Sequence, residues 1–268
     1  MADLITDLIH FIEHSPTAWH AVATVRRQLS SAGFTPLEEG SPWKLKKGER
    51  YVVQRDGSIC AFTLPKAAPT RLRVVGAHTD SPGLKLKPNP DVQSGIFHQL
   101  STEIYGGPLL SSWMNRDLGL AGRVIVETSK GQIEEKVVFL NKTPLVIPQI
   151  AIHLDREVNE KGLIIDKQDQ LRPILTLSPA EKPQLEPLLK KHIDFKHLLS
   201  FDLFLVPLEA PRLLGMNEEL LASYRLDNLA SSHACMMAIA QAKMHTTLQM
   251  MILWDAEEIG SRDRKSVV

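Results

Sequence analysis

Hydrophobic residues at the start of the chain recur at the spacing of an amphipathic helix. This helix is predicted over residues 2–14, and its apolar side carries Leu4, Ile5, Leu8, Ile9 and Ile12. Ser15 and Pro16 end it and begin a second helix, since proline is well tolerated at a first helical position. The second helix runs to about Ser31, with Gly33 as its stop. The pattern therefore predicts a pair of N-terminal helices.

The spacing then changes to that of strands. Asp56-Gly57 reads as the turn of a hairpin that joins residues 51–53 to residues 59–62. The apolar run 72–75 predicts a buried strand that ends just before His78. A helix over 228–244 and a second buried strand over 248–254 follow much later. Strands that alternate with helices predict an α/β sheet with its functional side chains at the carboxyl ends of strands.

The segment between these parts has a different character. It contains short strand-like runs, at 123–127 and 136–140, which are separated by Gly and Pro, and a Lys- and Leu-rich stretch at 178–200 that we expect to be helical. We therefore expect a discontinuous α/β domain formed by residues 1–87 and 209–268, with an inserted, mostly β domain at residues 88–208.

The amino-acid composition argues against some classes of binding partner. The 268 residues include 31 Lys and Arg and 31 Asp and Glu, so no charge surplus points to nucleic acid. The N-terminus does not resemble a signal peptide, and no apolar run approaches the roughly 20 residues that span a bilayer. We expect a cytoplasmic protein with no membrane partner, in which Cys60 and Cys235 are reduced and buried.

Three clusters, at residues 76–80, 225–228 and 255–261, carry the candidate chemistry. His78 and Asp80 are two residues apart, so in extended backbone they point to the same side. A histidine can bind zinc through one ring nitrogen while a carboxylate fixes the other. The alternative for this cluster is a surface turn, because residues 80–83 are rich in turn formers.

Acidic side chains dominate the other two clusters. Asp227 precedes a predicted helix and could cap it, or its two carboxylate oxygens could bridge two metal ions. Glu257 and Glu258 follow an apolar strand, where neighbouring carboxylates repel each other unless a cation binds them. One could then ligate the metal while the other takes a proton from water. The alternative is a solvated acidic turn.

His153 lies inside the inserted domain, in an apolar run where a histidine is more often a core residue than a ligand. His98 and His233 are weaker outside candidates.

Together, these segments resemble the M18 metallopeptidases, the aspartyl aminopeptidases. The resemblance extends from the first helix to residue 261 and is carried by five blocks in order: 76–90 (GAHTDSPGLKLKPNP), 105–124 (YGGPLLSSWMNRDLGLAGRV), 147–159 (IPQIAIHLDREVN), 225–233 (RLDNLASSH) and 255–261 (DAEEIGS). Ala256 departs from the pattern, since relatives often carry a polar residue there.

The resemblance implies an enzyme that removes N-terminal Asp or Glu from peptides with two zinc ions per complete subunit. His78 would ligate one zinc, Asp227 would bridge both, and Glu258 would ligate the second. Glu257 would be the general base and Asp80 would orient His78. The inserted domain would mediate dimer contacts within a homo-oligomer, a dodecamer in this family. Its His153 would reach a neighbouring subunit's site to bind substrate and stabilise the oxyanion, or act as a ligand.

The resemblance also implies that the chain is truncated at its C-terminus, because relatives continue and supply a further metal-binding Asp and His. We therefore expect weak metal binding and little activity from this chain alone. Residues 263–268 also match the translation of a common sequencing-adapter DNA, so we expect that residues 262–268 are not native. A non-catalytic assembly subunit and a related two-metal amide hydrolase remain the alternatives.

Overall fold

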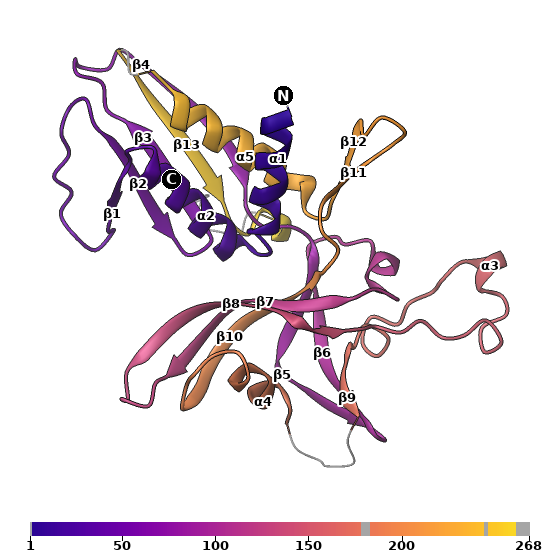
Figure 1. The fold of residues 1–268 in the computed structure, drawn as a ribbon. Helices are drawn as coiled ribbons and strands as arrows, with labels where there is room; N and C mark the ends of the chain where they lie inside the picture. Colours follow the sequence, from indigo (N-terminus) through magenta and orange to yellow (C-terminus); the bar gives the residue numbers. More distant parts are fainter. Residues whose placement is uncertain (1, 178–182, 244–245, 261–268) are drawn as a thin grey trace. The chain divides into compact units, whose positions relative to one another are not determined.

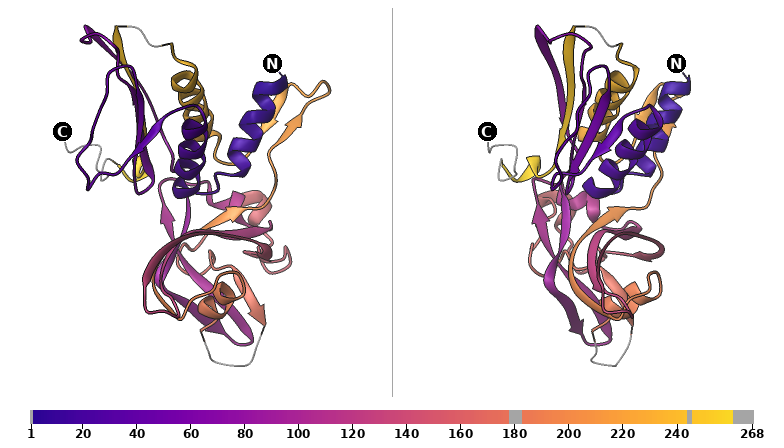
Figure 2. Two further views of the ribbon diagram at one scale, coloured as in Figure 1. Left: turned by 60° about the vertical axis from the view of Figure 1, so that its left-hand side comes forward. Right: turned by 90° about the vertical axis from the view of Figure 1, so that its left-hand side faces the viewer.

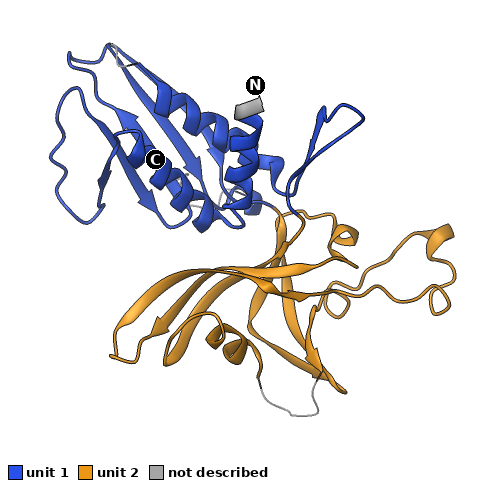
Figure 3. Ribbon diagram, in the orientation of Figure 1, with its two compact units in different colours: residues 1–81, 210–268 blue, residues 82–209 orange. Residues whose placement is uncertain are grey.

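The computed structural model describes residues 2–177, 183–243 and 246–260, and it divides into two compact units (Figure 3). The first unit is formed by Met1–Ser81 and Ala210–Val268, and the second by Pro82–Glu209. The chain enters the second unit earlier than the expected start at residue 88, because the first strand of that unit begins at Gly83. The prediction about residues 262–268 lies outside the described residues.

The first unit is built on a mixed five-stranded sheet in the order β1-β2-β3-β13-β4 (Figure 1). Its strands are β1 (Thr35–Leu37), β2 (Arg50–Arg55), β3 (Ser58–Thr63), β4 (Arg71–His78) and β13 (Thr247–Trp254). The predicted hairpin is confirmed, since β2 and β3 pair antiparallel around Asp56 and Gly57. β13 pairs antiparallel with β3 and parallel with β4. A small hairpin of β11 (Arg212–Leu214) and β12 (Leu220–Ala222) completes the strands of this unit.

Three helices cover one face of this sheet (Figure 2): α1 (Ala2–Glu13), α2 (Ala18–Ser31) and α5 (Leu226–Gln241). The predicted N-terminal helix pair is confirmed, and Gly33 follows α2 with a φ of +86°. The helices and the sheet share one hydrophobic core, which includes Phe11, Val22, Leu29, Val52, Ile59, Leu229, Met236, Met251 and Leu253. The apolar side of each helix therefore packs against the sheet.

The prediction that residues 72–75 form a buried strand is right about the strand and wrong about its burial. Leu72 is 59% exposed and Val74 is 48% exposed. Among the described residues β4 pairs only with β13, so it forms an edge of the sheet. A run of apolar residues predicts a strand but carries no information about how many neighbours the strand has.

The second unit is a six-stranded antiparallel sheet in the order β8-β7-β10-β5-β6-β9. Its strands are β5 (Gly83–Ser94), β6 (Phe97–Tyr105), β7 (Leu118–Glu127), β8 (Ile133–Leu145), β9 (Ile174–Leu177) and β10 (His197–Pro207). Its short helices are η1 (Leu110–Trp113), α3 (Val158–Lys161) and α4 (Leu185–Lys190). Its own core of Leu and Val side chains lies mainly on β5, β7, β8 and β10.

The predicted helix over 178–200 is only partly correct. Residues 178–182 lie outside the described part, helix is limited to α4, and the chain from His197 onward pairs with β7. Helical composition is a weak preference that strand pairing overrides. The α/β fold class with a mostly β insertion is confirmed.

Cys60 and Cys235 are free thiols that are partly rather than fully buried. Burial raises the pKa of the Cys60 thiol to about 11, which keeps it protonated near neutral pH. Among the described helices, none combines the length and the apolar character that crossing a membrane requires.

Candidate metal centre

The candidate site forms where two neighbouring parallel strands of the first unit end. Trp254, the last residue of β13, is in register with His78, the last residue of β4. Parallel strands bring their carboxyl ends to the same edge of a sheet, so the segments that follow both strands meet there. The segment after β13 forms the 3-10 helix η2 (Glu257–Ile259). Two clusters far apart in sequence thus become neighbours.

The structure brings three of the predicted residues into one group. His78, Glu257 and Glu258 each offer a ligand atom, and these atoms lie within 4.8 Å of one another. Asp227 does not belong to this group, but its Oδ1 lies 3.4 Å from His78 Nε2. The Asp227 side chain is 86% exposed, so it can turn toward a cation. An imidazole surrounded by carboxylates is a donor set that suits zinc.

Asp80 positions the residues of this group through hydrogen bonds. It is 5% exposed, and His78 Nδ1 lies 3.4 Å from its Oδ1 and 3.1 Å from its backbone carbonyl oxygen. Its carboxylate also accepts the backbone N–H groups of Glu257 at 3.2 Å and Glu258 at 3.0 Å. Nδ1 of His78 is thereby occupied, which leaves Nε2 for the side that carries Asp227 and Glu257. This is the arrangement in which a carboxylate orients a metal-binding histidine.

The charges of the group favour a cation. Burial lowers the pKa of His78, but its hydrogen bonds to Asp80 and the negative charges of Asp80 and Glu257 outweigh burial, so the pKa is raised. Burial and the charges of Asp80, Glu257 and Asp227 raise the pKa of Glu258. The negative charges of Asp80 and Glu257 contribute to both shifts, and they repel the ionised carboxylate of Glu258. A divalent cation would remove this repulsion, so the donor set fits a metal.

Asp255 is a site residue to which sequence reasoning assigned no role. Burial, and then the charge of Asp80, raise the pKa of Asp255 to about 6. Its backbone N–H donates to Ser58 Oγ at 2.8 Å, and its Oδ1 accepts the N–H of Ala256 at 2.8 Å. Ala256 has a φ of +62°, a left-handed conformation in which Asn and Asp are enriched. An acidic residue directly after an apolar strand was the available signal in the sequence.

Arg225 is a second residue that sequence reasoning missed, although it belongs to one of the clusters. Its guanidinium donates to the backbone carbonyl of Ser15 at 2.5 Å, to the carbonyl of Thr79, and to Ser81 Oγ at 3.4 Å. Ser81 Oγ in turn donates to the carbonyl of Asp227 at 2.8 Å. The peptide bond between Asp227 and Asn228 is cis. Arg225 therefore ties the segment after β4 to the start of α5.

The remaining candidate histidines lie elsewhere. His153 is exposed, in the segment of the second unit between β8 and α3. His98 is buried on β6, also in the second unit. His233 is buried on α5, where its Nε2 lies 2.7 Å from Asp7 Oδ2 and its ring packs against Phe11. None of the three belongs to the group of ligand atoms around His78.

Comparisons with known proteins agree with this fold. Residues 11–267 match the family model described as aminopeptidase I zinc metalloprotease (M18). The probable M18 family aminopeptidase 2 of Clostridium novyi is 36% identical over 272 residues, which covers 97% of this chain and 62% of the relative. The chain belongs to the M18 family of zinc metalloproteases, and it spans about 62% of the length of this relative.

Solved structures show the same architecture. The crystal structure of an M18 aminopeptidase from Thermotoga maritima superposes with a TM-score of 0.80 at 25% identity, covering 97% of this chain and 59% of that one. The dodecamer of mApe1 from S. cerevisiae gives a TM-score of 0.82 at 26% identity, covering 98% and 62%. The resemblance drawn from the five sequence blocks is thus confirmed.

Proposed function

We propose that the complete protein is a two-zinc aminopeptidase that removes N-terminal Asp or Glu residues from peptides. The observation that carries this proposal is the convergence of His78, Glu257 and Glu258, whose ligand atoms lie within 4.8 Å, in a chain of a zinc metalloprotease family. The preference for acidic residues rests on the resemblance to the aspartyl aminopeptidases.

The proposed metal-binding roles follow the geometry. His78 would ligate one zinc through Nε2, which faces Asp227 at 3.4 Å, while Asp80 holds the other ring nitrogen. Asp227 would hold both ions, and its exposure leaves it free to turn. Glu258 would ligate the second zinc; burial, and then the negative charge of Asp80, raise the pKa of its carboxyl group.

Glu257 is proposed as the general base. A bound zinc pair would supply Lewis-acid activation of water and of the substrate carbonyl. Glu257 accepts the proton of the attacking water and later passes it to the leaving amine. Its side chain is 49% exposed and its Oε2 lies 3.9 Å from His78 Nε2, so it borders the ligand group while remaining open to solvent and substrate.

His153 is proposed to act in a homo-oligomer. We assign dimer contacts to the second unit and propose that His153 reaches a neighbouring subunit's site, where it binds substrate and stabilises the oxyanion. Its own segment supports an interface, since Ile150 is 53% exposed, Ile152 is 47% exposed and Leu154 is 74% exposed. Exposed apolar side chains that gather in one segment are typical of interaction surfaces. The dodecamer known for mApe1 supports the same assembly here.

The 268-residue chain by itself is proposed to be nearly inactive. A catalytic zinc normally has three protein ligands and an open position. The ligand set proposed above gives each ion of a zinc pair fewer than three side chains. We expect weak zinc binding and slow hydrolysis until a further Asp and a further His complete the set.

The test compares this chain with the chain encoded by the complete gene, using zinc content and hydrolysis of aspartyl, glutamyl and leucyl peptides. Glu257→Gln in the complete protein should retain zinc and lower the rate for acidic peptides by at least ~100-fold. Glu38→Gln, an exposed glutamate of the same unit, is the matched control and should change neither. Equal cleavage of leucyl peptides would contradict the acidic preference. A large complex without zinc would point instead to an assembly subunit.

A further inference from the structure

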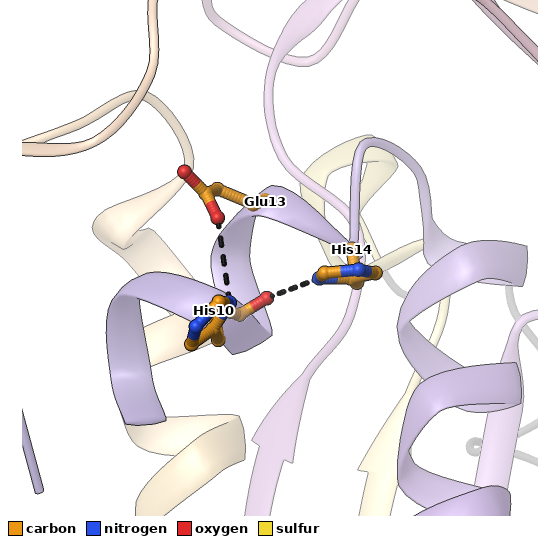
Figure 4. Close-up of side chains that lie close together, drawn as sticks. All are labelled: His10, Glu13 and His14. Atoms are coloured by element: carbon orange, nitrogen blue, oxygen red, sulfur yellow. Dashed lines mark hydrogen bonds and ion pairs between the residues drawn. The ribbon is translucent and has the colours of Figure 1, made fainter. Parts of the chain in front are cut away.

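A second group of metal-binding side chains lies at the end of α1, outside the candidate metal centre. It consists of His10, Glu13 and His14, shown in Figure 4. We propose that these three residues form a peripheral site for a divalent late transition-metal cation, with Zn²⁺ as its cellular occupant. Nothing in the proposed peptidase reaction uses them.

The spacing of the group suits chelation. Residues three and four apart on a helix lie on the same face, one turn above each other. His14 follows the last residue of α1, but its backbone N–H still bonds to the carbonyl of His10 at 3.2 Å, so the helical turn includes it. One ligand atom from each residue lies within 4.8 Å of the other two. Local helix geometry alone therefore brings three potential metal ligands together.

Two of the three side chains are already close to the spacing of metal ligands. Zinc–nitrogen bonds of about 2.0–2.1 Å place tetrahedral ligand atoms about 3.4 Å apart. His10 and Glu13 already approach this value, since His10 Nδ1 lies 3.6 Å from Glu13 Oε2. Their side chains are 67% and 38% exposed, so rotation about their side-chain bonds meets little steric resistance.

The ring of His14 is held by a hydrogen bond to the backbone of α1 (Figure 4). Its Nδ1 donates a hydrogen bond to the backbone carbonyl of His10 at 2.8 Å. A carbonyl oxygen can only accept, so the neutral ring carries its proton on Nδ1 and its lone pair on Nε2. Metal-binding histidines are commonly held in this way, with the second nitrogen bonded to a backbone carbonyl. The hydrogen bond therefore fixes the tautomer that a cation needs.

The donor types select the class of metal. Two imidazoles with one carboxylate suit Zn²⁺, Cu²⁺ or Ni²⁺, whereas Mg²⁺ and Ca²⁺ prefer sites made of oxygen ligands. The remaining coordination positions face solvent and can hold water. The competing interpretation is that the three side chains are solvated and bind no metal. The number of zinc ions bound per chain distinguishes the two interpretations.

The experiment measures Zn²⁺ binding to the 268-residue chain by equilibrium dialysis and calorimetry. The double variant His10→Gln/His14→Gln should bind about one equivalent of Zn²⁺ fewer than the parent chain. The matched control is His192→Gln/His197→Gln, which removes two exposed histidines of the second unit and should bind as the parent does. Equal stoichiometry in the double variant and the parent, or an equal loss in the control, would overturn the proposal.

A second measurement identifies the ligands directly. In the variant His78→Gln, which weakens the candidate metal centre, bound Cu²⁺ should give an electron paramagnetic resonance spectrum with splitting from two imidazole nitrogens. Adding His10→Gln and His14→Gln should abolish this signal. Circular dichroism checks that all variants fold, and the exposed positions of both histidines make a loss of fold unexpected. Survival of the two-nitrogen signal would refute the assignment to α1.

Discussion

Asp80 is a buried carboxylate whose two oxygens accept the backbone N–H groups of Glu257 and Glu258. The same side chain faces Nδ1 of His78 at 3.4 Å. It therefore fixes the segment that carries the proposed base Glu257 and the proposed ligand Glu258, together with the ring of His78, without needing to touch a metal. Residues with this role commonly change metal affinity when they are replaced.

We expect Asp80→Asn to lower zinc affinity by roughly 10–100-fold. In the variant, the side-chain NH₂ group would face the backbone N–H groups that donate to the Asp80 carboxylate in the parent protein. Two donors cannot bond to each other, so the segment that carries Glu257 and Glu258 would shift. Zinc titration against a competing chelator measures the loss. Asp194→Asn, at an exposed position of the second unit, should leave the affinity unchanged.

The His20 side chain contributes to the pH dependence of the free energy of unfolding. Burial, and then the charge of Arg225, lower the pKa of His20 from 6.5 to about 4. The folded protein therefore keeps this ring neutral over a range in which the unfolded chain binds a proton. Stability from this group is fully present above the unfolded pKa of 6.5 and is lost as the pH falls toward 4.

The expected loss from His20 is on the order of 1–3 kcal/mol of unfolding free energy across that interval. Denaturant unfolding at a series of pH values measures it. His20→Gln should flatten the slope in this window, because glutamine does not titrate. His197→Gln, at an exposed position, should keep the parental slope. An unchanged slope in His20→Gln would mean that other groups cause the pH dependence.

At the scale of elements, the turn between β2 and β3 supports the candidate metal centre. The carbonyl of Gly57 accepts the hydroxyl of Thr79 at 2.7 Å, and Ser58 Oγ accepts the N–H of Asp255 at 2.8 Å. A side chain on residue 57 would place its Cβ 2.2 Å from Asp255 Oδ2 and 2.9 Å from the Cβ of Ala18. Glycine at this position is therefore required by close packing against the site.

Gly57→Ala should destabilise the protein by about 1–3 kcal/mol, because the extra methyl group forces Asp255 or the turn to move. It should also weaken zinc binding, since Asp255 precedes the segment that carries Glu257 and Glu258. Thermal unfolding and zinc titration measure the two effects. Gly40→Ala is the matched control, because a Cβ there meets nothing within 4 Å. Equal stability of both variants would show that the turn adapts freely.

At the scale of the whole molecule, the apolar edge strand β4 is a liability for solubility. Leu72 and Val74 point to the same side of the strand and are 59% and 48% exposed, and Val75 is 41% exposed. Among the described residues β4 pairs on one side only. An exposed, apolar strand edge offers unpaired backbone groups to another chain and favours aggregation.

We therefore expect the 268-residue chain to aggregate, and Leu72→Lys/Val74→Lys to reduce that aggregation several-fold. Lysine on an edge strand opposes pairing with another chain at little cost to the exposed surface. Light scattering of about 10 μM protein, incubated at about 37 °C, measures the effect. Leu109→Lys, which is 74% exposed in the second unit, is the control and should change aggregation less. A parent chain that stays monodisperse would contradict this prediction.

Local pattern in the sequence determined many of the elements. The spacing of Leu4 to Ile12 required a helix, Asp56-Gly57 required a turn, and the apolar run before Asp255 required a strand. It also supplied the chemistry, because His78, Asp227, Glu257 and Glu258 were identifiable by residue type and by their positions next to elements. These features depend on interactions between residues a few positions apart, which a linear pattern records.

Tertiary structure decided the rest. The register that sets Trp254 beside His78, the exposure of β4, the reach of Arg225 to Ser15 and the burial of Asp255 all depend on which strands and helices become neighbours. Pairing between segments more than a hundred residues apart is selected by the packing of the whole core, and no local periodicity encodes it. The sequence thus named the candidate ligands, and only the fold determined their distances, their electrostatic environment and the residues that hold them.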